Sequence, residues 1–234
     1  MTRFLLASGS PRRRELFALL RWSFYVASAD VDESPCDDET PAQMVVRLAQ
    51  AKAVAVRDGV ETPSHGTVIV ASDTIVALDG VPLGKPCDSA DADRMLRALR
   101  GRTHQVHTAV TLFDTHVGRT HSDLATTDVP MRHYSDDELA TYIASGDPLD
   151  KAGAYAIQHA GFHPVENLHG CFANVMGLPL CHLARSLRAI GIEPDVDVPT
   201  ACQSHIKFEC PVFTHILNQT SREAVKRRSD DRFA

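Results

Sequence analysis

The chain has 234 residues, of which 44% are hydrophobic and 23% are charged, and its formal net charge is −6. This is the composition of a globular protein with one large domain or two small ones. The negative charge argues against a protein that coats nucleic acid, because that role needs a broad basic surface. No apolar run reaches the roughly 20 residues that a membrane-spanning helix needs. We therefore expect neither a nucleic-acid nor a membrane partner.

The six cysteines are scattered along the chain, and the first residues lead directly into an apolar run. A chain of this size does not need disulfides to stabilise its core, so free thiols are expected. The apolar run lacks the features of a signal peptide. Both observations favour a cytoplasmic protein.

The first fifteen residues predict a strand, a phosphate-binding loop and a helix. Residues 4–7 are apolar, Ser8-Gly9-Ser10-Pro11 follows, and three arginines open a helical pattern over residues 11–20. Small residues let the backbone approach a ligand, and N–H groups at a helix start point outward. Cations at that end oppose the helix dipole, so Arg12 and Arg13 indicate a bound anion such as phosphate. A solvated basic first turn is the alternative.

The remaining pattern alternates strands with helices and then forms a long hairpin. Strands are expected at residues 24–27, 68–71, 101–113 and 119–131, and helices at 40–56, 89–97, 135–145 and 179–190. Pro41 follows a capping threonine, and Ser135 with Glu138 has the spacing of a capping box. This order predicts the α/β class with a mixed sheet in a domain over residues 1–192.

Ser72-Asp73-Thr74 follows the buried run 68–71. Polar side chains at the carboxyl ends of strands lie where ligands bind in open α/β sheets. A carboxylate there can activate water or hold Mg²⁺. An aspartate that caps a helix or forms a turn explains the same spacing equally well.

Glu33 belongs to an acidic loop, Lys52 lies between alanines on a predicted helix, and Lys85 follows Gly84. A lysine between alanines usually faces solvent. The Gly84-Lys85-Pro86 segment is not a Walker loop. Three residues separate Gly80 from Gly84 where that loop needs four, and Pro86 replaces the required serine or threonine. Lys85 can still contact a phosphate from an ordinary loop.

The segment 193–234 differs in character from the rest of the chain. It begins with a proline- and aspartate-rich linker, and its last dozen residues, which are mostly charged and polar, are expected to be poorly ordered. Cys202, His205, Cys210 and His215 supply four soft ligands, but zinc modules usually have closer cysteine pairs. We favour an ordinary packed tail and expect the chain to fold and function without the residues after Ile192.

Several short motifs occur together in a characteristic order. They are Leu6-Ala7-Ser8-Gly9-Ser10-Pro11-Arg12-Arg13, Val31-Asp32-Glu33, Ala51-Lys52-Ala53, Ser72-Asp73-Thr74, Gly84-Lys85-Pro86, Gly101-Arg102-Thr103-His104, Asp150-Lys151-Ala152-Gly153-Ala154-Tyr155-Ala156-Ile157-Gln158 and Asn174-Val175-Met176-Gly177-Leu178-Pro179. In this order they closely resemble the Maf family of nucleoside triphosphate pyrophosphatases, over about residues 3–192.

The resemblance implies an elongated mixed β-sheet with flanking helices and a central cleft, like the inosine-triphosphate pyrophosphatases. It implies hydrolysis of a nucleoside triphosphate to the monophosphate and pyrophosphate with a divalent cation, Mg²⁺ or Mn²⁺. The family's presumed proton acceptor falls on Asp73, and its specificity positions fall on Arg12, Thr74 and Gln158. Family members often form homodimers.

The chemistry of the named residues agrees with this resemblance. Arg12, Arg13, Lys52 and Lys85 are suited to neutralising a triphosphate, and Glu33 is expected to help Asp73 hold the metal. The Gln158 amide offers a donor and an acceptor to a pyrimidine edge. The segment 151–158 resembles the branch that acts on dTTP and UTP.

Two departures and two alternatives stand beside that interpretation. His159 follows Gln158 where the family usually has glycine, and the tail has no counterpart. The alternatives are the same reaction on 7-methyl-GTP or another purine triphosphate, and a nucleotide-binding regulator of septum formation.

Overall fold

The computed structural model describes residues 2–28, 30–59 and 66–219. In this part of the chain a six-stranded mixed sheet has the order β2-β1-β3-β5-β6, with β4 paired to β3. Its strands are β1 (Arg3–Ala7), β2 (Phe24–Ala27), β3 (Thr67–Leu78), β4 (Val81–Leu83), β5 (Thr103–Asp114) and β6 (Arg119–Pro130). The predicted α/β class, mixed sheet and long hairpin are confirmed.

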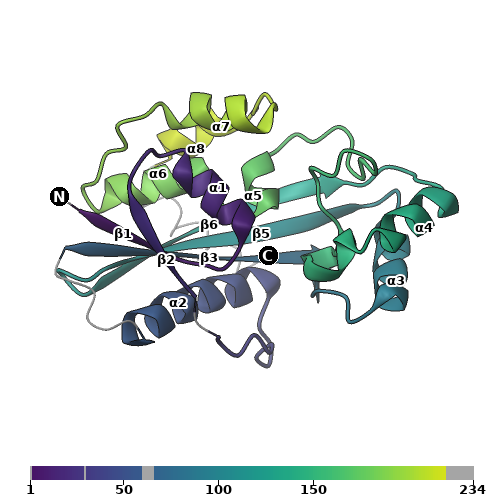
Figure 1. The fold of residues 1–234 in the computed structure, drawn as a ribbon, viewed down its shortest axis with the longest axis horizontal. Coiled ribbons are helices and arrows are strands. Elements are labelled where there is room, and N and C mark those ends of the chain that lie inside the picture. Colours follow the sequence, from purple (N-terminus) through teal and green to yellow (C-terminus); the bar gives the residue numbers. More distant parts are fainter. Residues whose placement is uncertain (1, 29, 60–65, 220–234) are drawn as a thin grey trace, which may run out of the picture.

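Helices cover both faces of the sheet (Figure 1), with α2 on one face and α1, α5 and α6 on the other. The helices are α1 (Pro11–Ala18), α2 (Pro41–Gly59), α3 (Ser89–Leu99), α4 (Asp136–Ala144), α5 (Phe172–Met176), α6 (Leu180–Ala189), α7 (Val198–Ile206) and α8 (Phe213–Asn218), with short 3-10 turns at Asp147–Asp150 and Ala152–Ala154. No helix in the described ranges is long and apolar enough to cross a membrane.

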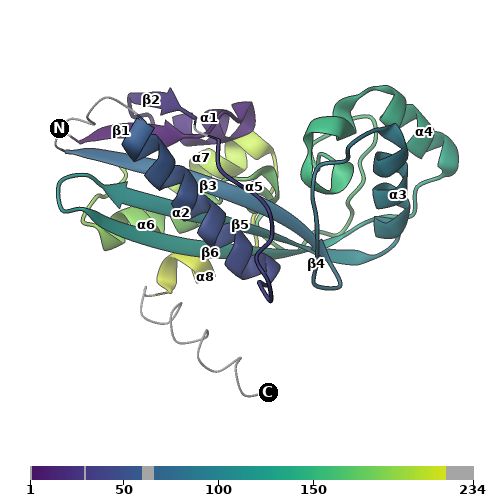
Figure 2. The same ribbon diagram turned by 90° about the horizontal axis from the view of Figure 1, so that it is seen from below.

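The molecule has two regions (Figure 2): a body built on most of the sheet, and a lobe that contains α3 and α4. The long strands β5 and β6 run from one to the other (Figure 2). One hydrophobic core cluster joins both regions, because it includes Leu6 and Leu183 of the body and Leu96 and Leu139 of the lobe. The lobe therefore packs on the distal end of the same sheet.

The strand that carries Asp73 does not end at Ser72, so the sequence-based boundary is wrong. β3 continues through Asp73 to Leu78, because the residues after Asp73 are β-branched or apolar and favour a strand. β1 stops at Ala7, opposite Ala71, and β4 pairs with the same edge of β3 only from Val76 onward. The loop after β1 therefore begins beside the Ser72–Thr74 stretch of β3.

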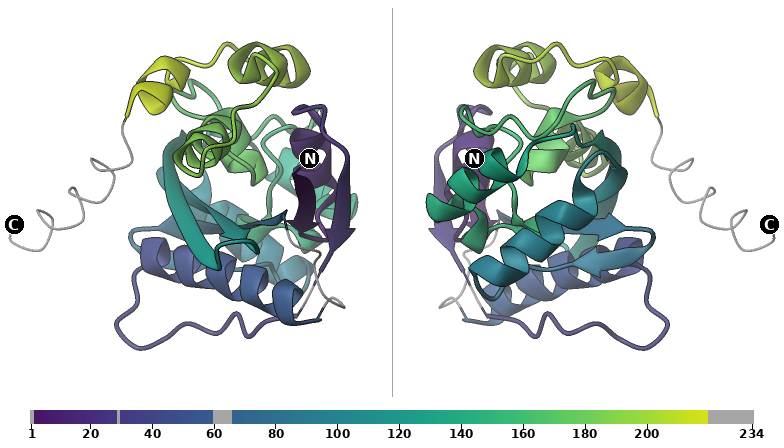
Figure 3. Two further views of the ribbon diagram at one scale, coloured as in Figure 1. Left: turned by 90° about the vertical axis from the view of Figure 1, so that its left-hand side faces the viewer. Right: turned by 90° about the vertical axis from the view of Figure 1, so that its right-hand side faces the viewer.

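Two helices of the segment 193–234 lie against α6 (Figure 3). Asp197 caps α7 by accepting a hydrogen bond from Thr200 N, and Pro199 stands in its first turn. This is a helix-start signal that the sequence interpretation assigned to a linker. Val198 and Cys202 join the main core. The expected disorder of the last dozen residues lies outside the described residues.

Candidate active site

The loop between β1 and α1 brings a pair of serines to the edge of the sheet. Ser8 is buried, and its Oγ accepts a hydrogen bond from Ser10 N (3.2 Å). Ser10 caps α1 by accepting from Arg13 N, and Pro11 is the first helical residue. The predicted strand, loop and helix are confirmed as elements.

Arg13 ties this loop to two distant segments. Its Nε donates to Gly177 O (2.8 Å), its Nη2 to Thr74 Oγ1 (3.0 Å) and its Nη1 to Ser8 Oγ (3.5 Å). Burial lowers the pKa of Arg13, and the charge of Asp73 opposes that shift. The guanidinium therefore holds the site together besides contributing charge to it.

Gly177 is required where Arg13 meets it. Its φ is +106°, a conformation that residues with a side chain rarely adopt. A Cβ there would lie 3.2 Å from Thr74 Oγ1 and 3.3 Å from Arg13 Nε. Ser72 Oγ also donates to the Gly177 carbonyl (3.0 Å). The sequence interpretation quoted Gly177 in a motif but gave it no role.

Thr74 is fixed from behind by a short polar chain. Its Oγ1 lies 3.0 Å from Thr108 Oγ1, and Thr108 Oγ1 donates to Asn174 O (2.9 Å). Asn174 in turn donates through Nδ2 to Val106 O and Thr127 Oγ1. Thr108 was not expected at the site, because nothing in its local sequence separates it from other strand threonines.

Three charged residues meet on the α2 face of the sheet. Lys52 Nζ donates to Asp73 Oδ1 (2.5 Å) and to Glu33 Oε1 (2.6 Å). The Asp73 side chain is 9% exposed, that of Lys52 17% and that of Glu33 59%. Lys52 thus links a buried carboxylate to one that faces solvent. We call Glu33, Lys52 and Asp73 the charge cluster.

The expectation that Lys52 faces solvent is wrong, and the sequence contained the signal to avoid it. The buried residues of α2 include Val45, Leu48, Ala49, Ala53 and Val56. Position 52 lies in this stripe, because it follows Leu48 by four residues and Ala49 by three. A lysine inside the buried stripe needs an acidic partner, and Asp73 provides it.

The pKa of Glu33 is lowered by several nearby cations. Partial burial tends to raise its pKa, but the hydrogen bond and charge of Lys52, with the charges of Lys85 and Arg13, leave it lowered. Lys85 itself is exposed beyond β4, and its segment is tied to the lobe because Gly153 N donates to Gly84 O (3.0 Å). The charge of Lys85 therefore reaches Glu33 from the segment that follows β4.

Gln158 belongs to the lobe, whereas Arg12 lies on α1. Gln158 is exposed in a turn after the 3-10 segment Ala152–Ala154. Ala156 lies two residues before Gln158, and its N–H donates to the Tyr142 hydroxyl of α4 (3.0 Å), which places the Gln158 turn at the lobe. Burial raises the pKa of Tyr142, and the charge of Arg12 opposes this rise.

Glu33 and Asp73 are the carboxylates of the charge cluster that a divalent cation would use. Glu33 Oε1 and Asp73 Oδ1 lie 2.6 Å and 2.5 Å from the same ammonium nitrogen, so the two carboxylates already face one cationic centre. No group of three or more His, Cys, Asp or Glu side chains able to hold a metal exists in the described ranges. The pair fits Mg²⁺, which commonly takes one or two carboxylates and completes its shell with substrate phosphates and water.

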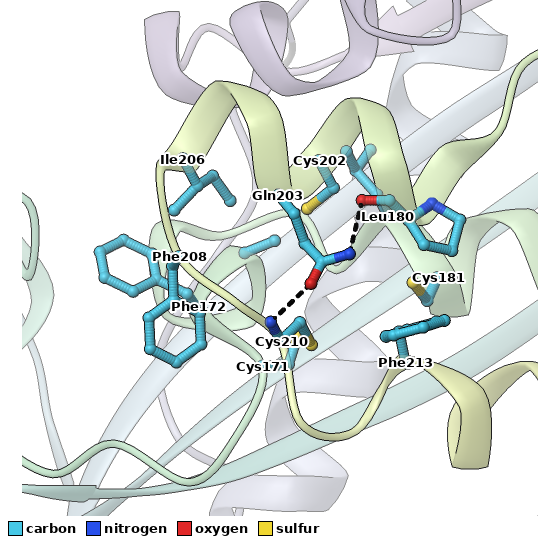
Figure 4. Close-up of a pocket in the computed structure, with 12 residues that line it drawn as sticks. Cys171, Phe172, Leu180, Cys181, Cys202, Gln203, Ile206, Phe208, Cys210 and Phe213 are labelled. Atoms are coloured by element: carbon cyan, nitrogen blue, oxygen red, sulfur yellow. Dashed lines mark hydrogen bonds between the residues drawn. The ribbon is translucent and has the colours of Figure 1, made fainter.

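The possible zinc ligands of the tail do not converge. Cys202 and Cys210 line a cavity of about 10 Å³ together with Cys171 and Cys181 (Figure 4), whereas His205 and His215 are exposed. All six cysteines are free. Burial raises the pKa of Cys171, Cys181 and Cys202 to about 12, so these thiols are protonated and pack as apolar groups.

Two known proteins are similar to this chain over most of its length. A protein named dTTP/UTP pyrophosphatase from Geotalea uraniireducens (strain Rf4) is 44% identical over 187 residues, which are 80% of this chain and 94% of that protein. One of the same name from Vibrio vulnificus (strain YJ016) is 44% identical over 180 residues, or 77% and 94% of the two chains.

Among solved structures, a nucleoside-triphosphatase (dITP/XTP pyrophosphatase) from Mycobacterium abscessus is 13% identical with a TM-score of 0.42, and the match covers 93% of this chain and 100% of that one. A HAM1 protein from Coxiella burnetii is 17% identical with a TM-score of 0.38, covering 56% and 73%. The model of the family described as Maf-like protein matches residues 3–190. The chain therefore belongs to the Maf family.

Proposed function

We propose that this protein is a nucleoside triphosphate pyrophosphatase that hydrolyses dTTP and UTP to the monophosphate and pyrophosphate. The observation that carries the proposal is the charge cluster of Glu33, Lys52 and Asp73 beside the loop held by Arg13. The name shared by the relatives, dTTP/UTP pyrophosphatase, supports the choice of substrate.

The proposed mechanism assigns the attacking water to Asp73. Its carboxylate is aimed by the hydrogen bond from Lys52 and accepts the proton of a water directed at the α-phosphate. A triphosphate that enters offers Lys52 a new anionic partner. This frees Asp73 to act on the water, while Glu33 remains close to both.

Arg12, Arg13 and Lys85 stabilise the negative charge of the substrate and of the leaving pyrophosphate. Glu33 and Asp73 would hold a Mg²⁺ or Mn²⁺ that arrives with the substrate. Such an ion polarises the phosphate and lowers the pKa of bound water. The three cationic side chains and the metal ion would each place positive charge where the reaction develops negative charge.

Gln158, with Arg12 and Thr74, is proposed to select the base. An amide can pair with the carbonyl and N–H edge that thymine and uracil share. A base that would leave these polar groups unpaired in the closed complex is rejected. Of the three, Thr74 is already bound to Arg13 and Thr108, so we assign it to positioning Arg13 as well.

A pyrophosphate-release assay over dTTP, UTP, CTP, ATP, GTP and 7-methyl-GTP tests the proposal. We expect dTTP and UTP to give the highest kcat/KM, and Gln158→Glu to weaken discrimination. A purine triphosphate as best substrate would favour the alternative branch. Tight binding without turnover of any triphosphate would favour a regulator.

We further propose a cytoplasmic location and a homodimer. Free thiols at all six cysteines are consistent with the reducing cytoplasm. Sedimentation of the purified chain tests the second.

A further inference from the structure

Gln158 occupies a corner of a hydrogen-bonded turn, and both ends of this turn contact Tyr142 of α4. His159 N donates to Ala156 O (3.1 Å), which closes the turn around Ile157 and Gln158. Ile157 is buried and Gln158 is exposed. The direction of the Gln158 amide therefore depends on how the two ends are held.

The first end is held by the hydroxyl of Tyr142. This buried group accepts a hydrogen bond from Ala156 N (3.0 Å) and donates to Asp147 Oδ2 (2.8 Å). Asp147 is itself bound by Lys151 Nζ (3.0 Å). The Tyr142 oxygen is thus fixed on both sides, and it fixes the backbone two residues before Gln158.

The second end is held by the ring of His159. Its centroid lies 4.7 Å from that of Tyr142 in an edge arrangement, and its Nδ1 accepts a hydrogen bond from Phe162 N (2.9 Å). The Phe162 ring stacks on Tyr142 at 4.3 Å. A glycine at position 159 could make neither the ring contact nor this hydrogen bond.

We propose that Tyr142 and His159 are positioning residues for base selection, which fix the turn so that Gln158 presents its amide in one direction. This inference rests on the proposed function. A turn already held in place loses less conformational freedom when the base binds.

Tyr142→Phe tests the inference, with Tyr134→Phe as the matched control. Tyr134 is equally buried, its hydroxyl donates to Leu96 O (2.5 Å), and its ring also packs on Phe162 at 4.8 Å. Each change removes one buried hydroxyl from the lobe, but only Tyr142 holds the turn of Gln158.

We expect Tyr142→Phe to lower the ratio of kcat/KM for dTTP over GTP about three- to tenfold, mainly through KM, which corresponds to one lost hydrogen bond. Tyr134→Phe should leave the ratio unchanged. Inhibition by inorganic pyrophosphate, which has no base, should be equal in both variants and the wild type.

Variants of His159 separate its two contacts. His159→Phe keeps the ring on Tyr142 and loses the acceptor, whereas His159→Asn keeps an acceptor for Phe162 N and loses the ring. We expect both, and His159→Gly more than either, to reduce the ratio without changing inhibition by pyrophosphate.

Equal ratios in Tyr142→Phe and Tyr134→Phe, or a loss of pyrophosphate inhibition that accompanies the loss of selectivity, would overturn the inference. The ranking of bases by the wild type tests the proposed function separately. The change in ratio between the best and the poorest base tests the positioning role, whichever base ranks first.

Discussion

Asp73 and Asp123 lie on strands of the same sheet and are buried to the same extent, each 7% exposed as a whole residue, but their partners differ. Both oxygens of Asp123 bind the Arg185 guanidinium at 2.7–2.9 Å, and Arg185 also donates to Ile216 O and Gln219 Oε1. Asp73 is bound through Oδ1 to a lysine that Glu33 shares.

The difference distinguishes a structural ion pair from the pair that we propose to be functional. In a bidentate pair the N–H donors of arginine bind both oxygens of the carboxylate, and this geometry resists rearrangement. A lysine shared by two carboxylates has a flexible stem and can exchange one partner for a phosphate. Asp123 thus fixes α6 and α8 to the sheet, while the charge cluster keeps the capacity to bind.

The strongest test of this comparison is Asp73→Asn. We expect turnover to fall by at least about 10²-fold, because the amide cannot accept the proton of water. Lys52 keeps Glu33 as a partner, so the free energy of unfolding should change little. Steady-state kinetics and urea unfolding measure the two effects. Turnover within tenfold of wild type would remove Asp73 from the mechanism.

Asp123→Asn should show the opposite behaviour. It leaves the buried Arg185 charge without its carboxylate, which costs about 3–5 kcal/mol in the free energy of unfolding. The rate per folded molecule should stay near that of wild type. A variant as stable as wild type would contradict the structural role of this pair.

Arg12→Ala and Lys85→Ala examine the functional region, with Arg14→Ala as the control in the same basic run. Arg14 is exposed and carries no proposed role. Losing a charge-assisted contact with phosphate should reduce kcat/KM roughly tenfold or more for each of the first two. Arg14→Ala should be silent. A residue whose variant matches Arg14→Ala belongs to the solvated surface.

Removal of the residues after Ile192 examines the structural region. It deletes Val198, Cys202 and Ile216, which are buried, and the carbonyl that Arg185 binds. We expect a loss of roughly 1–3 kcal/mol in the free energy of unfolding. The kcat of the folded chain should persist. Loss of kcat in a chain that still unfolds cooperatively would give the tail a role in activity.

The pH dependence of stability should be gradual, because two buried histidines contribute to it over more than two pH units. Burial lowers the pKa of His104 and of His182 to about 4. Between pH 6.5 and 4 the unfolded state takes up protons that the folded state does not, so stability falls as the pH falls, by up to about 1.4 kcal/mol per pH unit and proton. His182→Leu should have a shallower slope, which urea titrations at several pH values measure.

Much of the fold was accessible to sequence reasoning because it rests on local periodicity. The capping box at Ser135 and Glu138 and the hairpin of β5 and β6 follow from residues close in the chain. The motifs led to the prediction of Asp73 and Arg13 as site residues, although the strand end expected before Asp73 was wrong. α7 was missed although Asp197 and Pro199 mark its start.

The sequence alone determined the family, the α/β class, and the types of side chain available for the chemistry, because motifs and apolar periodicity are local properties. Only the tertiary structure decided their partners. Arg13 meets Gly177, Lys52 joins Glu33 to Asp73, and Tyr142 holds the turn of Gln158. These contacts join segments far apart in the chain, and they depend on where β1 stops beside β3 and where the lobe packs, which no local pattern encodes.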